Sequence, residues 1–193
     1  MAVDSRKLKL ILAVTGASGS VYAKMILDTL VKEQEQLERV DIIYSNEAIS
    51  VWNHELSGIE YKSYPFNYYD RADFYAPCAS GSNQYDAMIV CPCTMGTLGR
   101  IANGISNDLI TRTADVMLKE QQKLILVARE SPYSAIHLKN MLSITQAGAL
   151  VVPASPSFYS LPQTTEAIIK TVTDRVLIKA GLKLDFKGWS EIE

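Results

Sequence analysis

Residues 8–20, LKLILAVTGASGS, decide the fold class of this chain. The apolar run 8–14 is typical of a buried strand, and the apolar side chains of residues 21–31 recur at helical spacing. Between them stand Gly16, Ser18 and Gly19. A strand, a glycine turn and a helix start form a common anion site, because glycine lets a ligand approach the backbone and the first N–H groups of a helix lack partners. We expect these N–H groups to face a ligand.

The glycine turn fits neither of two common nucleotide fingerprints. Val14 stands two residues before Gly16, where the pattern GxGxxG requires a glycine, and no Gly-Lys-Ser/Thr follows as in a P-loop. A turn that serves only to pack the helix on the strand explains this segment equally well when it is taken alone.

The composition predicts one globular domain, residues 1–193, with a C-terminal tail from about residue 181. The 193 residues are 48% hydrophobic and 21% charged, and the net charge of -2 with no basic cluster excludes a nucleic-acid footprint. No apolar run approaches the ~18–20 residues that span a bilayer, and residues 1–7 are too polar for a secretory signal. Cys78, Cys91 and Cys93 have no disulfide spacing. We therefore expect a cytoplasmic, reduced protein.

Four further strands alternate with helices along the chain. The expected strands are residues 40–44, 87–90, 123–128 and 149–152. The expected helices after the first are 46–56, a broken helical region after 97, 107–120, 134–146 and 164–180, and residues 57–82 are expected to be irregular. Five alternating strands predict an α/β fold with a parallel sheet covered on both faces, a Rossmann-like (flavodoxin-like) three-layer sandwich.

Polar or proline-bearing segments follow every expected strand. In order they are residues 16–19, 45, 91–97, 129–130 and 155–159. Ligands of such sheets bind outside the carboxyl ends of the strands. These segments share that edge, so the sequence predicts a small-molecule site there.

Each charged residue that is a candidate for the site can also be explained without a functional role. Arg129 offers a fixed cation, and Glu130 beside it is either an acid/base group or a cap or surface carboxylate. Arg112 and Lys119 lie on one face of their helix, which by itself favours a solvated, salt-bridged surface. Two histidines and a C-x-C motif do not have zinc-ligand spacing. A Cys–His nucleophile pair has no supporting motif, although the sequence does not exclude it.

Several longer motifs occur in one order along the chain. They are TGASG at 15–19, ASGS at 79–82, CPCTMGTL at 91–98, NDLI-x-R-x-ADV-x-LKE at 107–120, RESP at 129–132, HL-x-NML at 137–142 and PSFY at 156–159. Over about residues 8–180 this series resembles the flavin prenyltransferases of the UbiX/Pad1 type.

The resemblance implies an activity and an assembly. Enzymes of this family transfer a dimethylallyl group from a dimethylallyl phosphate to N5 and C6 of reduced FMN, and the prenylated FMN passes to UbiD-type decarboxylases. They need no metal. They assemble as homo-oligomers, typically dodecamers, with sites between subunits, so some residues of this chain would act in a neighbour's site.

The resemblance also assigns residues by position. The flavin would be held by Gly16, Ala17, Ser18, Ser45, Thr94, Met95, Gly96, Thr97 and Arg129. The prenyl phosphate would be held by Arg112, Lys119, Tyr159 and Arg175. The catalytic residues would be Ser18, Glu55, Lys119 and Glu130, with Glu130 and Ser18 relaying protons. Cations suit a leaving phosphate, because negative charge builds there as the C–O bond breaks. Trp189 would match an aromatic residue of the family tail that covers the substrate.

Two alternatives remain open at this point. A related group of flavoproteins contains FMN-dependent cysteine decarboxylases, which carry a catalytic histidine and a Pro-x-Met-Asn-type segment that this chain lacks. A non-catalytic FMN-binding partner subunit would not need Lys119, Glu130, Tyr159 and Arg175 together.

Overall fold

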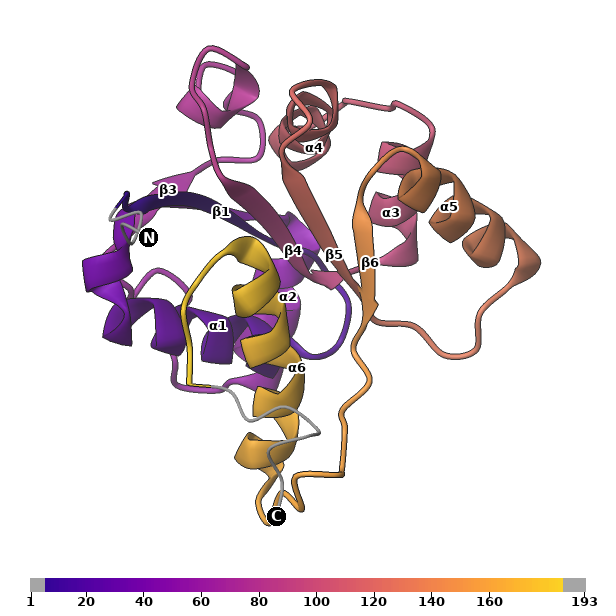
Figure 1. Ribbon diagram of the computed structural model, residues 1–193. Helices are drawn as coiled ribbons and strands as arrows, with labels where there is room; N and C mark the ends of the chain where they lie inside the picture. The colour runs from indigo at the N-terminus through magenta and orange to yellow at the C-terminus, as the bar shows by residue number, and fades with distance from the viewer. Residues whose placement is uncertain (1–5, 186–193) are drawn as a thin grey trace, which may run out of the picture.

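The computed structural model describes residues 6–185 and contains one sheet of six parallel strands. Their order is β3-β2-β1-β4-β5-β6. The strands are β1 (Leu8–Val14), β2 (Leu37–Tyr44), β3 (Asn67–Tyr69), β4 (Ala87–Cys93), β5 (Lys123–Ala128) and β6 (Leu150–Pro153). The predicted α/β class with a parallel sheet is confirmed (Figure 1).

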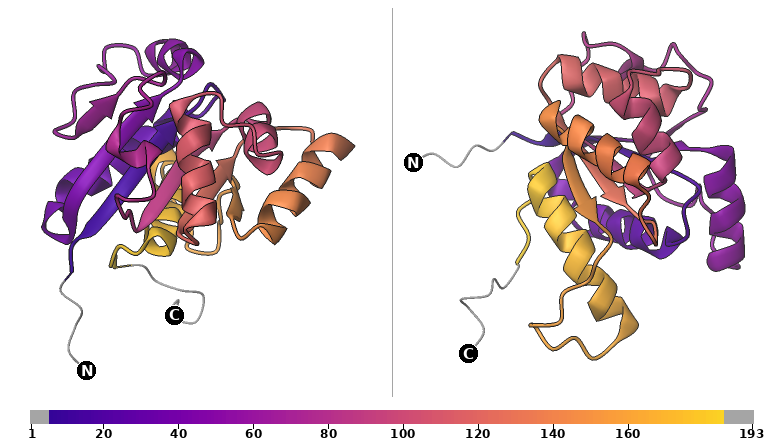
Figure 2. Two further views of the ribbon diagram at one scale, coloured as in Figure 1. Left: turned by 90° about the horizontal axis from the view of Figure 1, so that it is seen from above. Right: turned by 90° about the vertical axis from the view of Figure 1, so that its right-hand side faces the viewer.

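Helices cover both faces of the sheet (Figures 1 and 2). One face carries α1 (Ser20–Lys32), α2 (Asn46–Glu55) and α6 (Thr165–Ala180). The other carries α3 (Met95–Ala102), α4 (Leu109–Lys119) and α5 (Ala135–Gln146), with the short 3-10 helices η1 (Gln34–Gln36) and η2 (Pro77–Ala79) in the connections. Alternate residues of β1 feed the two cores: Leu10 and Leu12 face α1, whereas Ile11 and Ala13 face α4.

The prediction of five strands was wrong by one, because β3 lies within residues 57–82. Strand β3 has only three residues, too few for a periodic signal. Contacts with β2 hold it in place: Asn67 donates to the buried Asp41 at 3.0 Å, and Arg39 donates to the Tyr69 hydroxyl at 2.6 Å. Without β3 the order is that of flavodoxin, and with it the order is that of the Rossmann fold.

Local capping explains where the helices begin. Ser45, Asp108, Ser134 and Thr164 are the N-cap residues of α2, α4, α5 and α6, and each side chain accepts a hydrogen bond from the first turn. Glycine at 148, with φ of 103°, follows α5 as expected. Strand β2 begins earlier than expected, at Leu37, because that residue pairs with the start of β1.

Two expectations concern the ends of the chain and the membrane. Trp189 lies outside the described residues. Within residues 6–185, no helix is both long enough and apolar enough to cross a membrane.

Candidate functional site

Backbone hydrogen bonds place the segments after five strands side by side. They run from Ser45 N to Val14 O (3.0 Å), Thr15 N to Pro92 O (3.3 Å), Arg129 N to Cys93 O (3.2 Å) and Ala154 N to Ala128 O (2.9 Å). We call residues 16–19, 45, 94–97, 129 and 130 the glycine-turn edge. It lies where strand order reverses between β1 and β4, the usual ligand position in such a sheet.

Thr15 ties the glycine turn to the start of α3. Its side chain is buried; the hydroxyl donates to the Pro92 carbonyl at 2.7 Å and accepts from the Thr94 N–H at 2.9 Å. Sequence reasoning assigned Thr15 only to the turn, because no local pattern reveals a contact made 79 residues away along the chain.

Helix α2 lies along the glycine turn. A Cβ at Gly16 would collide with the Cβ of Glu47 in the first turn of α2, so close helix packing requires glycine there. Gly19, with φ of 113°, adopts a left-handed conformation at the start of α1. The close approach of Glu47 therefore supports the interpretation in which Gly16 packs the turn against α2.

The anion at the start of α1 belongs to the chain itself. The Glu55 carboxylate accepts from Gly19 N at 2.9 and 3.1 Å and from Ser20 N at 2.7 Å. For the N–H groups of Gly19 and Ser20, the expectation that they face a ligand was therefore wrong. The cause is tertiary, since α2 returns Glu55 to a turn that precedes it by 36 residues.

Glu55 is ionised at neutral pH. Partial burial raises the pKa of its carboxyl, but hydrogen bonds from the Ser18 hydroxyl and from the N–H groups of Gly19 and Ser20 outweigh burial and leave the pKa below its ordinary value. A carboxylate in this state accepts a hydrogen bond from Ser18. The structure thus brings together two of the predicted catalytic residues.

Two further helix starts border the same edge. Ser45 accepts from Ala48 N at 3.1 Å at the start of α2, and Thr94 accepts from Thr97 N at 3.1 Å at the start of α3. The first-turn N–H groups of a helix carry partial positive charge and bind phosphate. The Thr94 and Thr97 hydroxyls, 3.0 Å apart, add polar groups. These donors fit the phosphate of FMN.

The predicted flavin residues differ in exposure. Ala17, Ser45, Met95 and Thr97 are buried, whereas Ser18, Gly96 and Arg129 are exposed. The Met95 side chain belongs to the core beside α4, so this residue offers the site its backbone rather than its thioether.

Arg129 and Glu130 follow β5 directly and are exposed. Burial raises the pKa of Tyr22 in α1, whereas the charge of Arg129 lowers it. The Glu130 carboxylate accepts from Ser131 N at 3.0 Å. Tyr22, whose ring lies 3.0 Å from a Cβ built on Gly19, is a member of this edge that sequence reasoning missed.

The predicted phosphate cations Arg112 and Lys119 lie elsewhere. Lys119 ends α4 shortly before β5 begins, at the amino ends of the strands. Since β5 has 6 residues and a parallel strand rises about 3.3 Å per residue, Lys119 is roughly 20 Å from the glycine-turn edge. We call Arg112, Lys119 and Glu120, with the adjoining residues 79–82, the α4 cation face.

Tyr159 lies on an arm made by residues 154–164 and the start of α6, and Arg175 follows in the second half of α6. Ser157 N donates to the Thr171 hydroxyl at 3.1 Å, and Arg175 lies one turn after Thr171 on the same helix face. The arm and α4 lie at opposite ends of the molecule in Figure 1. One chain by itself therefore does not bring the predicted phosphate residues together.

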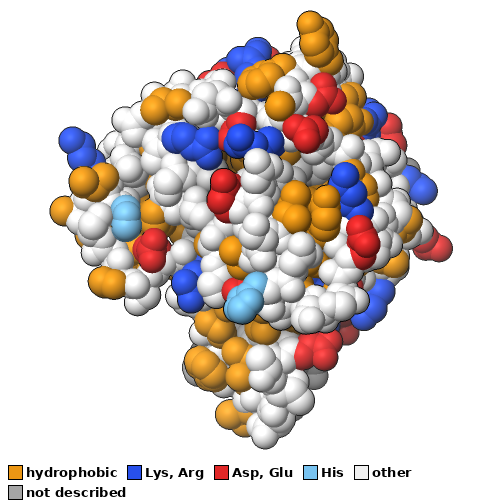
Figure 3. Space-filling view, turned by 180° about the vertical axis from the view of Figure 1, so that it is seen from behind, with side chains coloured by type: hydrophobic (Ala, Val, Ile, Leu, Met, Phe, Trp, Pro, Cys, Tyr) orange, Lys and Arg blue, Asp and Glu red, His pale blue; other side chains and the backbone are white. Residues whose placement is uncertain are grey.

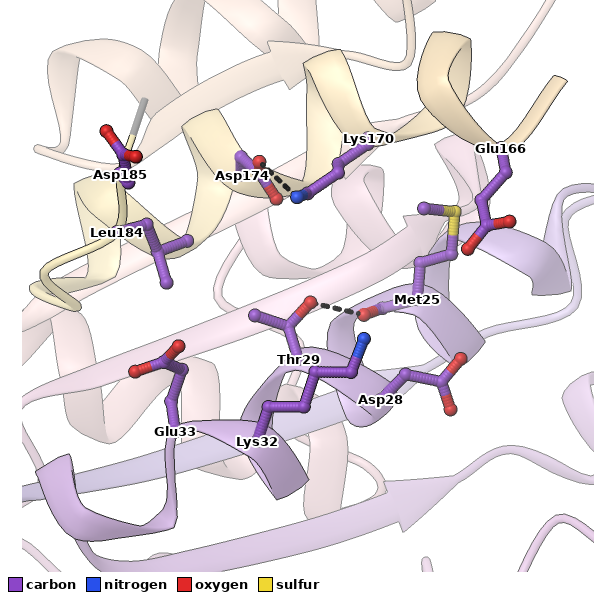
Figure 4. A pocket seen from close by; sticks show the side chains of 10 residues that line it. All are labelled: Met25, Asp28, Thr29, Lys32, Glu33, Glu166, Lys170, Asp174, Leu184 and Asp185. Carbon is purple, nitrogen blue, oxygen red and sulfur yellow. Dashed lines mark hydrogen bonds and ion pairs between the residues drawn. The ribbon is translucent and has the colours of Figure 1, made fainter. Parts of the chain in front are cut away.

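A cleft lies between α1 and α6 (Figure 4), and its lining differs from that of the glycine-turn edge. Its volume is about 260 Å³, and its charged lining residues are Asp28, Lys32, Glu33, Glu166, Lys170, Asp174 and Asp185. Carboxylates outnumber lysines, so the cleft repels phosphates. Burial raises the pKa of Asp174, and one of its carboxylate oxygens has no hydrogen-bond partner.

The cysteines do not form a nucleophilic or metal site. Cys78, Cys91 and Cys93 are free and buried, and burial raises the pKa of Cys93 to about 12, so it stays a thiol at neutral pH. His137 accepts from Ser134 N at 3.2 Å as part of the α5 cap. Among the residues described, no group of His, Cys, Asp and Glu could hold a metal ion.

Large apolar side chains reach the surface on α5, on β6 and on the arm (Figure 3, where the arm projects at the bottom). They include Ile136, Leu138, Leu142, Leu150, Phe158 and Leu161. An exposed apolar surface of this kind is typical of a protein–protein interface.

Comparison with known proteins identifies the family. A family model described as Flavoprotein matches residues 2–177. The flavin prenyltransferase UbiX of Methanocaldococcus jannaschii is 44% identical over 188 residues, which cover 96% of this chain and 100% of that protein. The chain belongs to the flavin prenyltransferase family.

Solved structures of this family share the fold. AnUbiX (PadA1) in complex with FMN and dimethylallyl pyrophosphate is 36% identical with a TM-score of 0.84, covering 95% of this chain and 100% of that one. A dodecameric FMN-dependent UbiX-like decarboxylase from Escherichia coli O157:H7 is 37% identical with a TM-score of 0.85, covering 94% and 100%.

The cysteine decarboxylases are more distant from this flavin prenyltransferase family member. TvaF, an FMN-dependent cysteine decarboxylase from thioviridamide biosynthesis, is 19% identical with a TM-score of 0.62 and covers 92% of this chain and 100% of its own. That likeness shows the fold alone.

Proposed function

We propose that this protein is a flavin prenyltransferase, which transfers a dimethylallyl group from dimethylallyl phosphate to N5 and C6 of reduced FMN. The observation that carries the proposal is the glycine-turn edge. There the chain juxtaposes residues 16–18, 45, 94–97 and Arg129, the positions that the family resemblance assigns to the flavin. The names of the relatives support the same activity.

Several residues of the glycine-turn edge together bind reduced FMN. Ser45 and residues 94–97 hold it through hydroxyl and N–H groups at two helix starts, and Arg129 adds a cation. Reduced FMN, when bound, supplies the nucleophilic N5 and C6 atoms.

Proton movement is assigned to Ser18, Glu55 and Glu130. Glu55, with its lowered pKa, stays ionised and fixes the Ser18 hydroxyl by accepting its hydrogen bond. Glu130 is exposed after β5, so it can exchange protons with solvent. Arg112, Lys119, Tyr159 and Arg175 stabilise the negative charge that develops on the leaving phosphate.

In this proposal, the residues that bind the prenyl phosphate come from more than one copy of the chain. The α4 cation face and the arm lie far from each other within one chain, so different subunits would supply them to one site. A homo-oligomer, here proposed as a dodecamer like the Escherichia coli neighbour, would cover the exposed apolar side chains of α5 and the arm. The prenylated FMN would pass to a UbiD-type decarboxylase in the cytoplasm.

An anaerobic incubation tests the activity directly. Reduced FMN incubated with dimethylallyl monophosphate or diphosphate should gain the mass of one dimethylallyl group less one hydrogen, with release of phosphate or diphosphate. Glu130→Gln should keep FMN affinity and lose about 100-fold or more in kcat, because it removes a proton-transfer group. An unchanged flavin mass with both donors contradicts the proposal, and full turnover of the variant removes Glu130 from the mechanism.

A further inference from the structure

We propose that Glu120 is a positioning residue, which fixes the Lys119 ammonium against residues 79–82 before the prenyl phosphate binds. The inference rests on the proposed function in one respect, that Lys119 binds the donor phosphate. It gives a role to Glu120 and to the motif ASGS at 79–82, neither of which the flavin-binding residues explain.

The contact between Lys119 and Glu120 is unusual for neighbours in sequence. Consecutive residues of a helix do not face each other. Glu120 is the residue at which α4 ends, with φ of -87° and ψ of 4°, and its carboxylate lies 2.8 Å from the Lys119 ammonium. The side chains are 50% and 43% exposed, so the pair adds little to folding stability. We therefore infer that the Lys119–Glu120 pair serves function rather than folding stability.

Gly81 brings the preceding loop against the same carboxylate. A Cβ at Gly81 would lie 2.8 Å from the Glu120 carboxyl carbon and 3.1 Å from its Cγ. The φ of Gly81 is not left-handed, so only the nearby Glu120 side chain, and not backbone conformation, opposes a larger residue there. The obstructing group is the end of a flexible side chain. An alanine would therefore displace the Glu120 carboxylate and leave the backbone in place.

Arg112 anchors the other end of the loop. Its Nε donates to the Ala79 carbonyl at 3.1 Å, and its Nη1 lies 3.3 Å from the Asp115 carboxylate. Each cation of the α4 cation face is thus paired with a nearby carboxylate. Arg112 pairs with Asp115 on one face of α4, and Lys119 pairs with Glu120 at the C-terminal end of α4. Each is also connected to residues 79–82, Arg112 directly and Lys119 through Glu120.

This arrangement prepares Lys119 to receive a phosphate. An ammonium has three N–H donors, and one hydrogen bond to Glu120 leaves two for phosphate oxygens. A free lysine loses much rotamer freedom when a ligand orders it, and Glu120 removes part of that cost in advance. Loss of Glu120 should therefore weaken donor binding and leave the chemical step almost unchanged.

The test compares two variants of the holo-oligomer at saturating reduced FMN. Glu120→Ala should raise the KM for dimethylallyl phosphate about 10-fold with kcat within about twofold, because only binding is lost. Glu120→Gln keeps an acceptor oxygen and should stay within about threefold of the parent KM. The matched control is Glu38→Ala, which breaks an exposed pair with Lys9 (3.1 Å) on another surface and should leave the KM unchanged.

A double-mutant cycle separates positioning from general structural damage. Gly81→Ala should raise the KM by displacing Glu120, and the double variant Gly81→Ala/Glu120→Ala should be no worse than Glu120→Ala alone. Lys119→Ala should lose most donor binding.

The outcomes distinguish the two proposals. If Lys119→Ala impairs donor use and Glu120→Ala does not, the positioning role is overturned and the proposed function stands. If Lys119→Ala has full activity, the assignment of the phosphate to Lys119 is wrong. Additive effects at Gly81 and Glu120, or loss of FMN affinity in Glu120→Ala, would also overturn the positioning role.

Discussion

Glu55 at the glycine-turn edge and Asp174 in the α1–α6 cleft are carboxylates whose pKa values move in opposite directions. Glu55 at the edge is exposed and accepts hydrogen bonds from two backbone N–H groups, and its pKa is lowered. Asp174 in the cleft is 6% exposed and has an oxygen without a partner, and its pKa is raised by burial. The supply of hydrogen-bond donors, together with burial, decides the direction in which the pKa of each carboxyl moves.

The position of each carboxylate on its helices explains the difference. Glu55 meets the start of α1, where N–H groups lack partners within the helix. Asp174 lies between the flanks of α1 and α6, where the backbone N–H groups are already bonded within the helices. Lys170, with its ammonium 3.7 Å away, is the cation paired with Asp174. An edge made of helix starts is therefore suited to anions, and a cleft between helix flanks is not.

Thr15→Val disrupts the glycine-turn edge and should have the largest effect on the free energy of unfolding. The substitution keeps the shape and removes the hydroxyl that bridges the Pro92 carbonyl and the Thr94 N–H. Loss of these two bonds should lower the free energy of unfolding by about 2 kcal/mol, which is roughly a 4–8 °C fall in Tm for a chain of this size. FMN affinity should also fall, because the start of α3 is displaced. Thr15→Ser is the control, and an unchanged Tm in Thr15→Val would show that the bridge is dispensable.

Glu55→Gln tests whether the charge of Glu55 stabilises the start of α1 at the glycine-turn edge. It removes the negative charge at the start of α1 and should lower the free energy of unfolding by about 1 kcal/mol at pH 7, with solvent exposure limiting the effect. A lowered pKa in the folded state means stability that is present above the unfolded value and lost as pH falls through the folded value. Urea unfolding should therefore show the two proteins converging below about pH 4. A constant difference across pH would contradict an electrostatic role.

Asp174→Asn should have the smallest effect and the opposite sign. A raised pKa means that folding is most favourable with the carboxyl protonated and that stability is lost as pH rises through the folded value. The amide avoids that loss and should raise the free energy of unfolding by about 0.5 kcal/mol at pH 7. The gain should disappear near the unfolded value of about pH 3.9. A less stable variant at pH 7 would mean that the ion pair with Lys170 outweighs burial.

The sequence alone determined five of the six strands, the helix starts and the common edge. These features depend on local signals: a run of apolar residues for β1, a capping hydroxyl at Ser45 or Thr164, and the rule that parallel strands end at one edge. The resemblance to a family then supplied residue roles, of which the structure places Ser18, Glu55 and Arg129 at the glycine-turn edge.

Only the tertiary structure decided which distant groups meet. Strand β3 exists because Asp41 and Arg39 bind its side chains, and Glu55 fills the start of α1 because α2 returns along the glycine turn. The separation of Lys119 from Tyr159 within one chain is likewise a result of packing. Periodicity reports the face on which a side chain lies, whereas contacts between residues far apart in sequence depend on how whole helices pack against the sheet.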